Sequence, residues 1–141
     1  SKEQLLDLIP QRPPMVMIDA LTESNDDLYK TEFIVQKDNV FLEDGKLCEA
    51  GLIENIAQTA AAGEGYKHFK RNESIPTGFI GAIQKLKIEQ LPECDTKITT
   101  EVTLDNKVLN VSVISGQVFY QEKVIASCTM KVFLLDSATG S

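Results

Sequence analysis

The feature of this sequence that most constrains its fold is one long stretch of helix-forming residues, most of them small or apolar. Residues 50–66 read Ala-Gly-Leu-Ile-Glu-Asn-Ile-Ala-Gln-Thr-Ala-Ala-Ala-Gly-Glu-Gly-Tyr. If the helix runs on to about Arg71, it spans roughly 33 Å at the usual rise per residue, although Gly63 and Gly65 are costly in a helix interior. A helix that is apolar on most sides is expected to be mostly buried, and its small residues imply close packing against a flat layer.

The remaining residues alternate between strand patterns and turn-forming residues. Apolar residues at helical spacing, followed by prolines at 10, 13 and 14, predict a short N-terminal helix. Two apolar runs on either side of the polar residues 24–27 predict a β-hairpin formed by 15–21 and 29–35. Further strands are expected at 78–88, 97–104, 108–120 and 124–135, with turns at 44–45, 105–106 and 121–122.

This order of elements predicts a single domain of the α+β class. Strands joined by short turns pair antiparallel, and a sheet with one apolar face needs a covering layer. The long helix is the element that can provide it. The length of 141 residues and the hydrophobic content of 43% suit one core. We expect the domain to comprise residues 1–136 and residues 137–141 to form a loose tail.

Charge and cysteine content exclude several functions. The net charge of −7 disfavours bulk electrostatic binding to nucleic acid or anionic lipid. No stretch approaches the roughly 18 apolar residues of a membrane span, and residues 1–4 lack the pattern of a signal peptide. The three cysteines, Cys48, Cys94 and Cys128, are scattered and odd in number. We therefore expect no disulfide framework and a reducing, cytoplasmic location.

Histidine is scarcer still, because His68 is the chain's one histidine. That count excludes a His-rich zinc site and any chemistry that needs two imidazoles from one chain. The cysteines include no C-x-x-C pair, so they do not suggest a thiolate metal site either. We expect no bound metal.

Polar residues on the long helix fall into one stripe. Glu54 and Gln58 are four residues apart, as are Asn55 and Thr59, and residues at this spacing lie on the same side of a helix. The spacing by itself also fits an ordinary N-terminal charge at Glu54 that meets solvent or a backbone donor.

Three segments resemble, in order, the 3-hydroxyacyl-acyl-carrier-protein dehydratases. Residues 8–19, Leu-Ile-Pro-Gln-Arg-Pro-Pro-Met-Val-Met-Ile-Asp, resemble the family's opening L-P-H-R-x-P-x-L-L-V-D. Residues 52–58 resemble the central helix L-I-x-E-x-x-A-Q, and residues 79–88 resemble the strand that follows it. Residues 39–47 are most similar to the dehydratase-like proteins of aryl polyene and flexirubin-type pigment synthesis.

The resemblance implies a hot-dog fold, in which a curled antiparallel sheet wraps around one long central helix. Family members work as dimers and hold the acyl chain in a tunnel at the subunit interface. The resemblance also implies acyl carrier protein or coenzyme A thioesters as substrates and no cofactor. Either a homodimer or a heterodimer with a related dehydratase is consistent with it.

The family's dehydration chemistry uses a histidine from a G-H-F-P-G loop of one subunit and the helix carboxylate of the other. Glu54 matches that carboxylate and is the predicted catalytic residue. No histidine lies anywhere in residues 36–50, and Gln11 stands where the opening motif usually has histidine. The base that the family normally uses is therefore missing from this chain.

Further substrate contacts are implied around the helix start. Cys48 and Glu49 stand where the family has a Pro-Gly pair, so the N–H of Gly51 or Leu52 is expected to polarise the thioester carbonyl. Met15, Phe41 and Phe79 are candidates for an apolar tunnel wall, with ordinary core packing as the alternative. The predicted substrate-binding residues are Gly51, Leu52, Asn55, Gln58, Met15, Phe41 and Phe79.

His68 lies in a cationic cluster with Lys67, Lys70 and Arg71 near the end of the helix. It follows Glu54 by fourteen residues, or roughly 21 Å along a continuous helix, which is too far for a shared site within one subunit. The cluster is either a solvated helix end or a docking surface for the acidic surface or the phosphopantetheine phosphate of a carrier protein.

Three functions follow from these observations. The first is dehydration of a 3-hydroxyacyl thioester with Glu54 as acid or base. The second is a partner subunit that completes a heterodimeric dehydratase and contributes Glu54 or only the tunnel wall. The third is thioester hydrolysis with Glu54 as base or nucleophile, which needs no histidine.

Overall fold

The computed structural model describes residues 2–135. Within that range the long helix α2 (Glu49–Lys70) is continuous, as predicted. The other elements are α1 (Lys2–Leu6), β1 (Ala20–Ser24), β2 (Leu28–Ile34), β3 (Leu42–Glu43), β4 (Lys46–Leu47), β5 (Thr77–Ile88), β6 (Lys97–Val108), β7 (Val111–Tyr120) and β8 (Lys123–Leu135). The tail expected at 137–141 lies outside the described residues. No helix among residues 2–135 is both long and apolar enough to cross a membrane.

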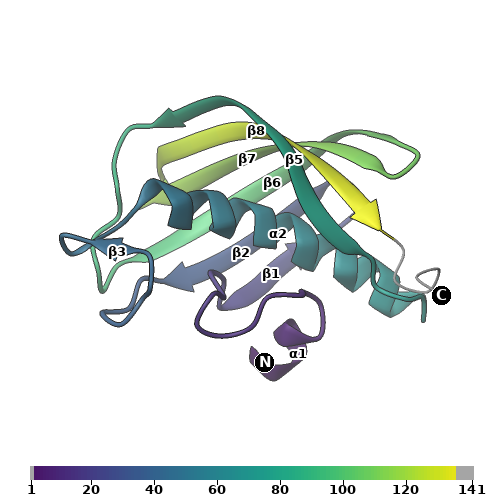
Figure 1. Cartoon of the computed structure of the whole chain (residues 1–141), viewed down its shortest axis with the longest axis horizontal. Helices are drawn as coiled ribbons and strands as arrows, with labels where there is room; N and C mark the ends of the chain where they lie inside the picture. The colour runs from purple at the N-terminus through teal and green to yellow at the C-terminus, as the bar shows by residue number, and fades with distance from the viewer. Residues whose placement is uncertain (1, 136–141) are drawn as a thin grey trace.

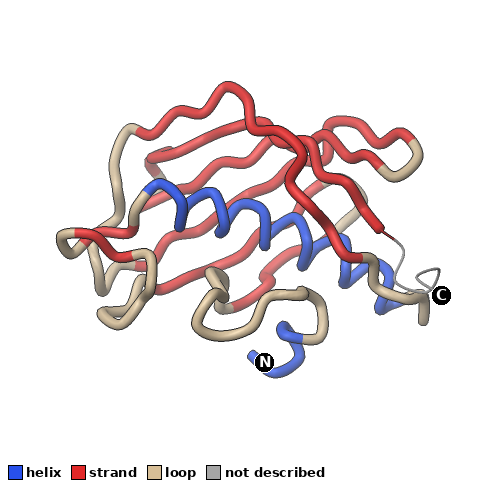
Figure 2. Tube along the Cα trace, in the orientation of Figure 1, coloured by secondary structure: helices blue, strands red, loops and turns tan. Residues whose placement is uncertain are grey.

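One antiparallel sheet contains the strands in the order β1-β2-β6-β7-β8-β5 (Figures 1 and 2). Strands β6, β7 and β8 form a meander joined by short turns. The chain reaches this meander from β5 by the longer connection 89–96, so β5 pairs with β8 rather than with β6. This order leaves β5 and β1 as the edge strands of the sheet.

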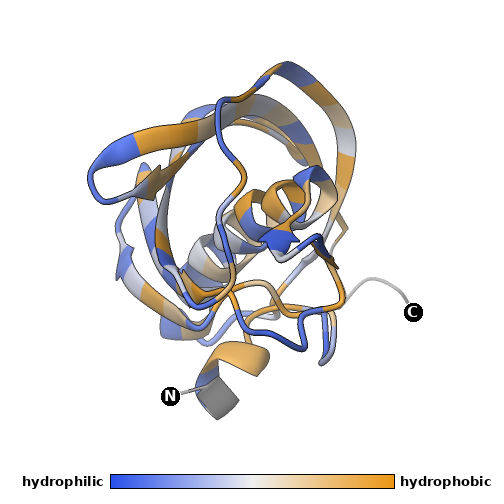
Figure 3. Ribbon diagram, turned by 90° about the vertical axis from the view of Figure 1, so that its left-hand side faces the viewer, coloured by the Kyte–Doolittle hydropathy of each residue, from blue (hydrophilic) through white to orange (hydrophobic). Residues whose placement is uncertain are grey.

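The sheet curls around α2, which gives the predicted hot-dog arrangement. Viewed end-on, the strands wrap around the helix and the N-terminal segment closes the remaining side (Figure 3). Inward-facing side chains of α2 and of the sheet form the main core, which includes Leu52, Ile56, Ile98, Val118 and Ile125. A second cluster packs the N-terminal segment against Ala62 of the helix. The apolar faces of helix and sheet are thereby removed from water together.

Two glycines allow the helix and the sheet to approach closely. A Cβ atom added at Gly63 would lie 2.1 Å from the ring of Tyr29, and one added at Gly116 would lie 2.4 Å from Cγ2 of Ile56. Side chains at these positions would push α2 away from β2 and β7. The small residues of the helix therefore serve the close packing that the sequence predicted.

The first predicted strand, 15–21, is wrong at its start, because β1 begins only at Ala20. Met17 and Ile18 are fully buried, as their apolar character requires. Their segment lies against α2, however, where side chains of the helix bind the backbone at Met15 and Met17. In residues 15–19, called the anchored segment below, backbone groups of Met15 and Met17 are thus satisfied by helix side chains instead of a neighbouring strand.

The predicted turn at 105–106 is also wrong, because β6 continues through it to Val108. The pairing with β7 shifts register between Leu104 and Asn106, and the exposed carboxylate of Asp105 accepts a hydrogen bond from Ser115. Polar residues that indicated a turn therefore lie on the outer face of a bulge. The turns at 44–45 and 121–122 are confirmed, and all four residues have positive φ.

Candidate functional site

A cavity of about 200 Å³ lies between α2 and the strands β5, β7 and β8. Glu54, Ala57, Ala61 and Glu64 line it from the helix, and their spacing places them on one side of α2 over roughly 15 Å. The opposite wall is mostly apolar and includes Phe79, Ile80, Ile114, Val132 and Leu134. The cavity therefore has a carboxylate toward each end, called the Glu54 end and the Glu64 end below.

At the Glu54 end, one protein side chain restrains the carboxylate. Nε2 of Gln58 donates a hydrogen bond to Oε2 of Glu54 at 3.0 Å, and Glu54 is half-buried. Gln11 lines the same cavity, and its buried Oε1 has no hydrogen-bond partner among residues 2–135. Most of the acceptor capacity of Glu54 is thus available to a ligand in an apolar cavity, which suits a group that moves a proton.

Gln58 and Asn55 hold the anchored segment against the helix. Oε1 of Gln58 accepts from the N–H of Met17 at 2.6 Å, and its Nε2 donates to the carbonyl of Met15 at 2.9 Å. Nδ2 of Asn55 donates to the carbonyl of Met17 at 2.8 Å, and its Oδ1 accepts from the hydroxyl of Thr100. Both amides are fully buried. Both amides hold the anchored segment, Gln58 also holds Glu54, and neither amide lines the cavity.

At the Glu64 end, several donors surround the carboxylate. The hydroxyl of Tyr29 donates to Oε2 of Glu64 at 2.7 Å, and Nζ of Lys107 donates to Oε1 at 2.8 Å. Nζ of Lys67 lies 3.7 Å from Oε2. Burial by itself raises the pKa of Glu64, but the hydrogen bonds from Lys107 and Tyr29 and the charges of Lys107 and Lys67 outweigh it, so the pKa lies below its ordinary value.

The same contacts act on the phenol of Tyr29. Burial, followed by the hydrogen bond to Glu64 and the negative charge of Glu64, raises the pKa of Tyr29. Nζ of Lys67 lies 5.0 Å from the centre of the tyrosine ring, which is a cation–π distance. The Glu64 end therefore holds an ionised carboxylate and a neutral phenol.

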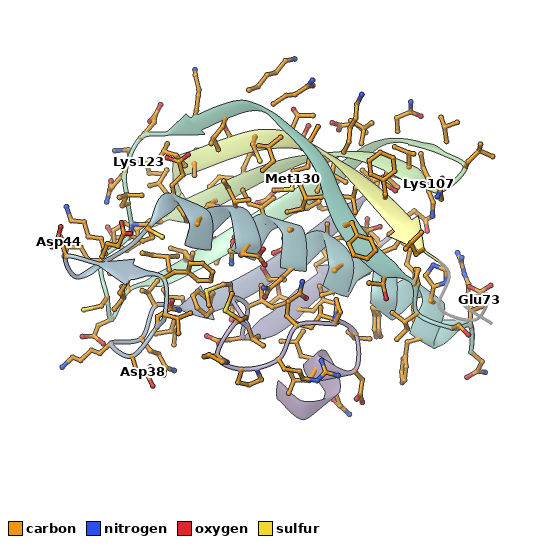
Figure 4. All side chains as sticks on the ribbon, in the orientation of Figure 1. Asp38, Asp44, Glu73, Lys107, Lys123 and Met130 are labelled. Atoms are coloured by element: carbon orange, nitrogen blue, oxygen red, sulfur yellow. The ribbon has the colours of Figure 1, made fainter. Side chains whose placement is uncertain are left out.

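His68 also belongs to this end of the molecule. Its Nε2 lies 3.8 Å from Glu64 and its Nδ1 lies 3.2 Å from Glu73. Figure 4 shows Glu73 and Lys107 at the end of the molecule opposite Asp38 and Asp44. Because α2 is continuous from Glu49 to Lys70, the predicted separation of roughly 21 Å between Glu54 and His68 along the helix applies.

The remaining predicted substrate contacts are spread over the molecule. Phe79 lines the cavity and is 52% exposed. Leu52 is fully buried and its N–H donates to the carbonyl of Cys48. Gly51 is buried beneath Phe41 and Leu47, where a Cβ would collide, and Phe41 packs against the main core. Phe79 therefore shares a cavity with Glu54, whereas Gly51, Leu52 and Phe41 lie in or against the core.

Met15, also predicted as tunnel wall, is 42% exposed and does not line the cavity. Only part of the predicted docking cluster is exposed. Lys67 is turned inward to Glu64, Tyr29 and the carbonyl of Asp26, whereas Lys70 and Arg71 remain exposed. The exposed cations of this helix end are therefore fewer than the sequence suggested.

Among the polar residues that line the cavity, sequence reasoning missed four as site candidates: Gln11, Tyr29, Glu64 and Ser112. Gln11 had a signal, because it replaces a histidine of the family's opening motif. Glu64 also had one, because a carboxylate ten residues after Glu54 on an apolar helix lies on a similar face. Tyr29 and Ser112 had no local signal, since they reach the cavity only through the pairing of distant strands.

Comparison with known proteins identifies the family. The family model of ApeP-like proteins, described as ApeP dehydratase, matches residues 3–140. This chain belongs to the ApeP-like dehydratase family. The predicted resemblance to the dehydratase-like proteins of aryl polyene synthesis is thereby confirmed. No curated protein matches the chain.

Solved structures agree with the fold of this ApeP-like chain. The dehydratase heterocomplex ApeI:P from Xenorhabdus doucetiae matches with a TM-score of 0.88 and 16% identity, over 95% of this chain and 92% of that chain. Cj0977 from Campylobacter jejuni matches with a TM-score of 0.72 and 12% identity, over 94% and 96% of the two chains. A hypothetical thioesterase with coenzyme A from Streptococcus pneumoniae matches with a TM-score of 0.66 and 12% identity, over 82% of this chain and 86% of that chain. At these identities the matches support the hot-dog fold alone.

Proposed function

We propose that this chain is the carboxylate-bearing subunit of a two-chain 3-hydroxyacyl-thioester dehydratase, and that a second, histidine-bearing subunit completes the site. The observation that carries the proposal is the position of the chain's one histidine. His68 contacts Glu64 and Glu73 and is roughly 21 Å along α2 from Glu54. An imidazole beside Glu54 must therefore come from another polypeptide.

The reaction explains why two groups are needed. A base removes the proton from the α-carbon of the thioester, the bond between the β-carbon and its hydroxyl breaks, and an acid protonates the departing hydroxyl to give water. The products are water and the α,β-unsaturated thioester. Glu54 supplies one member of this acid–base pair and the partner's histidine supplies the other. Gln58 holds Glu54 toward the cavity in either role.

The edge strand β5 is the proposed contact for the second subunit. Its outer edge has no paired strand among residues 2–135, and it exposes the apolar side chains of Phe79, Ile80 and Ile83. An exposed apolar edge strand readily pairs with another chain. Phe79 and Ile80 also line the cavity, so a subunit bound there would close the cavity. The heterocomplex character of the similar ApeI:P structure supports a two-chain assembly.

The test is reconstitution with a histidine-bearing, ApeI-like dehydratase. The chain alone, the partner alone and the mixture are incubated with 3-hydroxyacyl carrier protein, and loss of water is read by mass. We expect the mixture to dehydrate the substrate and this chain alone to be inactive. Glu54→Gln in the mixture should lower kcat by about 10²- to 10⁴-fold. Glu49→Gln, which changes an exposed carboxylate at the helix start, is the matched control.

Each other outcome points to a different function. Full activity of the chain alone would overturn the two-chain assignment. Full activity of the Glu54→Gln mixture would mean that this chain contributes only a wall of the acyl tunnel. Release of free acid that depends on Glu54 would identify a thioesterase instead.

A further inference from the structure

Gln11 brings a buried polar atom without a partner into the wall of the cavity. Its side chain lines the cavity, and its Oε1 is buried with no hydrogen-bond partner among residues 2–135. A buried acceptor that meets no donor destabilises a protein, and the large majority of buried polar side-chain atoms are paired. An unpaired amide oxygen in a cavity wall therefore suits a ligand that donates a hydrogen bond.

The loop that contains Gln11 is held beside the carboxylate of Glu54. Nε2 of Gln58 donates both to Oε2 of Glu54, at 3.0 Å, and to the carbonyl of Met15, at 2.9 Å. The N–H of Met15 in turn donates to the carbonyl of Arg12 at 2.9 Å, and Arg12 follows Gln11 directly in the chain. A short series of hydrogen bonds thus connects Gln11 to the Glu54 end of the cavity.

The backbone around Gln11 is restrained on both sides. Nη1 of Arg12 donates to the carbonyls of Ile9 and Gln11, at 2.8 Å and 2.7 Å. The residue before Gln11 and the second and third residues after it are prolines, and each proline fixes its own φ angle. A side chain on a restrained loop loses less freedom when it binds a ligand. The amide of Gln11 is therefore preorganised at the cavity wall.

The donor that a 3-hydroxyacyl thioester offers beside its reacting carbons is the β-hydroxyl. The α-carbon carries only C–H groups, and the thioester carbonyl is an acceptor. The amide N–H groups of the pantetheine arm lie on the other side of the sulfur atom and are common to all such thioesters. A hydroxyl donates one hydrogen bond and can accept two, so it can bind Oε1 of Gln11 and still receive a proton from an acid.

We propose that Gln11 positions the β-hydroxyl of the substrate for elimination, with Oε1 of Gln11 accepting the hydroxyl hydrogen. This hydrogen bond directs the lone pairs of the hydroxyl oxygen toward the acid of the proposed acid–base pair. The base takes the α-proton, the acid protonates the oxygen, and the bond from the β-carbon breaks to release water. Gln11 exchanges no proton and is a positioning residue. This inference rests on the proposed function, because it treats the cavity as the site of the 3-hydroxyacyl group.

The test compares two pantetheine thioesters of equal chain length, one with and one without the 3-hydroxyl. Their dissociation constants are measured by calorimetry on this chain alone and on the two-chain assembly, with Glu54→Gln in every sample to prevent turnover. With Gln11 intact, we expect the 3-hydroxyacyl thioester to bind about fivefold more tightly, as for one neutral hydrogen bond. Gln11→Met, which keeps the length of the side chain without its amide, should abolish this preference. Gln117→Met, on the exposed face of β7, should keep it.

A second measurement separates positioning from support of the fold. The unsaturated product has no hydroxyl, so its affinity should be the same with Gln11 and with Gln11→Met. Removal of an unpaired amide should also leave the thermal unfolding temperature no lower than that of wild type. Equal weakening of substrate analogue and product by Gln11→Met would overturn the inference and leave Gln11 a merely structural residue.

Equal affinity for the two thioesters with Gln11 intact, in the chain alone and in the assembly, would also overturn the inference, and so would a full preference in Gln11→Met. Dehydration is scored separately, with Glu54 intact. Dehydration without a preference for the 3-hydroxyl refutes this inference alone, whereas a preference that depends on Gln11 without dehydration refutes the proposed reaction alone.

Discussion

Glu54 and Glu64 lie ten residues apart on the same helix and line the same cavity, yet the protein holds them differently. Glu54 is bound by a single neutral amide, that of Gln58. Glu64 is bound by a phenol and an ammonium group, with a second ammonium and His68 nearby. The N-terminal part of α2 uses its amides to bind the backbone of the anchored segment, and the C-terminal part uses ions to bind side chains.

This difference suits the two glutamates to different roles. A carboxylate surrounded by cations and donors is stabilised in its charged form, so Glu64 is suited to structure and recognition and poorly suited to proton transfer. A carboxylate with one neutral partner keeps free acceptor positions and can exchange a proton with a ligand. The comparison therefore supports the proposed acid–base role of Glu54 and indicates a different, charge-pairing role for Glu64, and three substitutions test this difference.

The largest effect is expected from Gln58→Leu, which removes the amide that holds the Glu54 end. Leucine is similar in size, but the buried N–H of Met17 and the carbonyl of Met15 would lose their partner. We expect the free energy of unfolding to fall by about 3 kcal/mol, measured by urea denaturation. Gln117→Leu, on the exposed face of β7, should change it by less than about 0.5 kcal/mol. A comparably small change in Gln58→Leu would show that the helix does not anchor residues 15–19.

A smaller effect is expected from Glu64→Gln, which keeps the shape of the side chain but removes its charge. Lys107 and Lys67 would lose their ion partner. Because Lys107 is partly exposed, solvent weakens this pair, and we expect the free energy of unfolding to fall by only about 1–2 kcal/mol near neutral pH. Glu101→Gln is the matched control, since its pair with Lys30 is exposed and spans 3.9 Å. Glu101→Gln should lower the free energy of unfolding by less than about 0.5 kcal/mol.

The difference in free energy of unfolding between wild type and Glu64→Gln should shrink as pH falls. Folding lowers the pKa of Glu64 below its ordinary value of 4.5, so on acidification the unfolded chain takes up this proton first. The stabilisation is therefore complete above that ordinary value and is lost as pH falls through the folded pKa. Urea denaturation at several acidic pH values should show wild type and variant converging. A constant difference would contradict the charged role of Glu64.

The smallest effect is expected from His68→Gln. The imidazole is partly exposed, 3.8 Å from Glu64 and 3.2 Å from the exposed Glu73, so its removal should change the free energy of unfolding by less than about 0.5 kcal/mol. Dehydration by the two-chain assembly should stay within about twofold of wild type, because the proposed acid–base pair does not include His68. A loss near that expected for Glu54→Gln would make His68 a catalytic residue and remove the need for a second subunit's histidine.

Local patterns predicted much of the fold but failed where another element binds the backbone. The long helix and the turns at 44–45 and 121–122 are confirmed, because each depends on residues close together in sequence. Residues 15–19 looked like a strand because they are apolar. Their backbone is instead bound by Gln58 and Asn55, which lie about forty residues further along the chain, and no local rule reports such a partner.

The candidate site likewise has a part that the sequence predicted and a part that it misplaced. Glu54 and Gln58 are joined by the four-residue spacing of one helix, so the sequence pointed to both. The helix-start residues Gly51 and Leu52 were expected at the substrate from the family pattern, but a position on a helix does not reveal which neighbour covers it. Here residues 41–47, which include the β3–β4 hairpin, cover the helix start.

The sequence by itself determined the long helix, its carboxylate at Glu54, the dehydratase resemblance and the scarcity of histidine, because these depend on local periodicity, motif order or counting. The tertiary structure alone decided which polar groups meet at the Glu64 end of the cavity. Tyr29 and Lys107 reach Glu64 across 35 and 43 residues of chain, and Ser112 joins them through the pairing of β6 with β7. Such contacts depend on strand order and register, which arise from the packing of the whole sheet around α2.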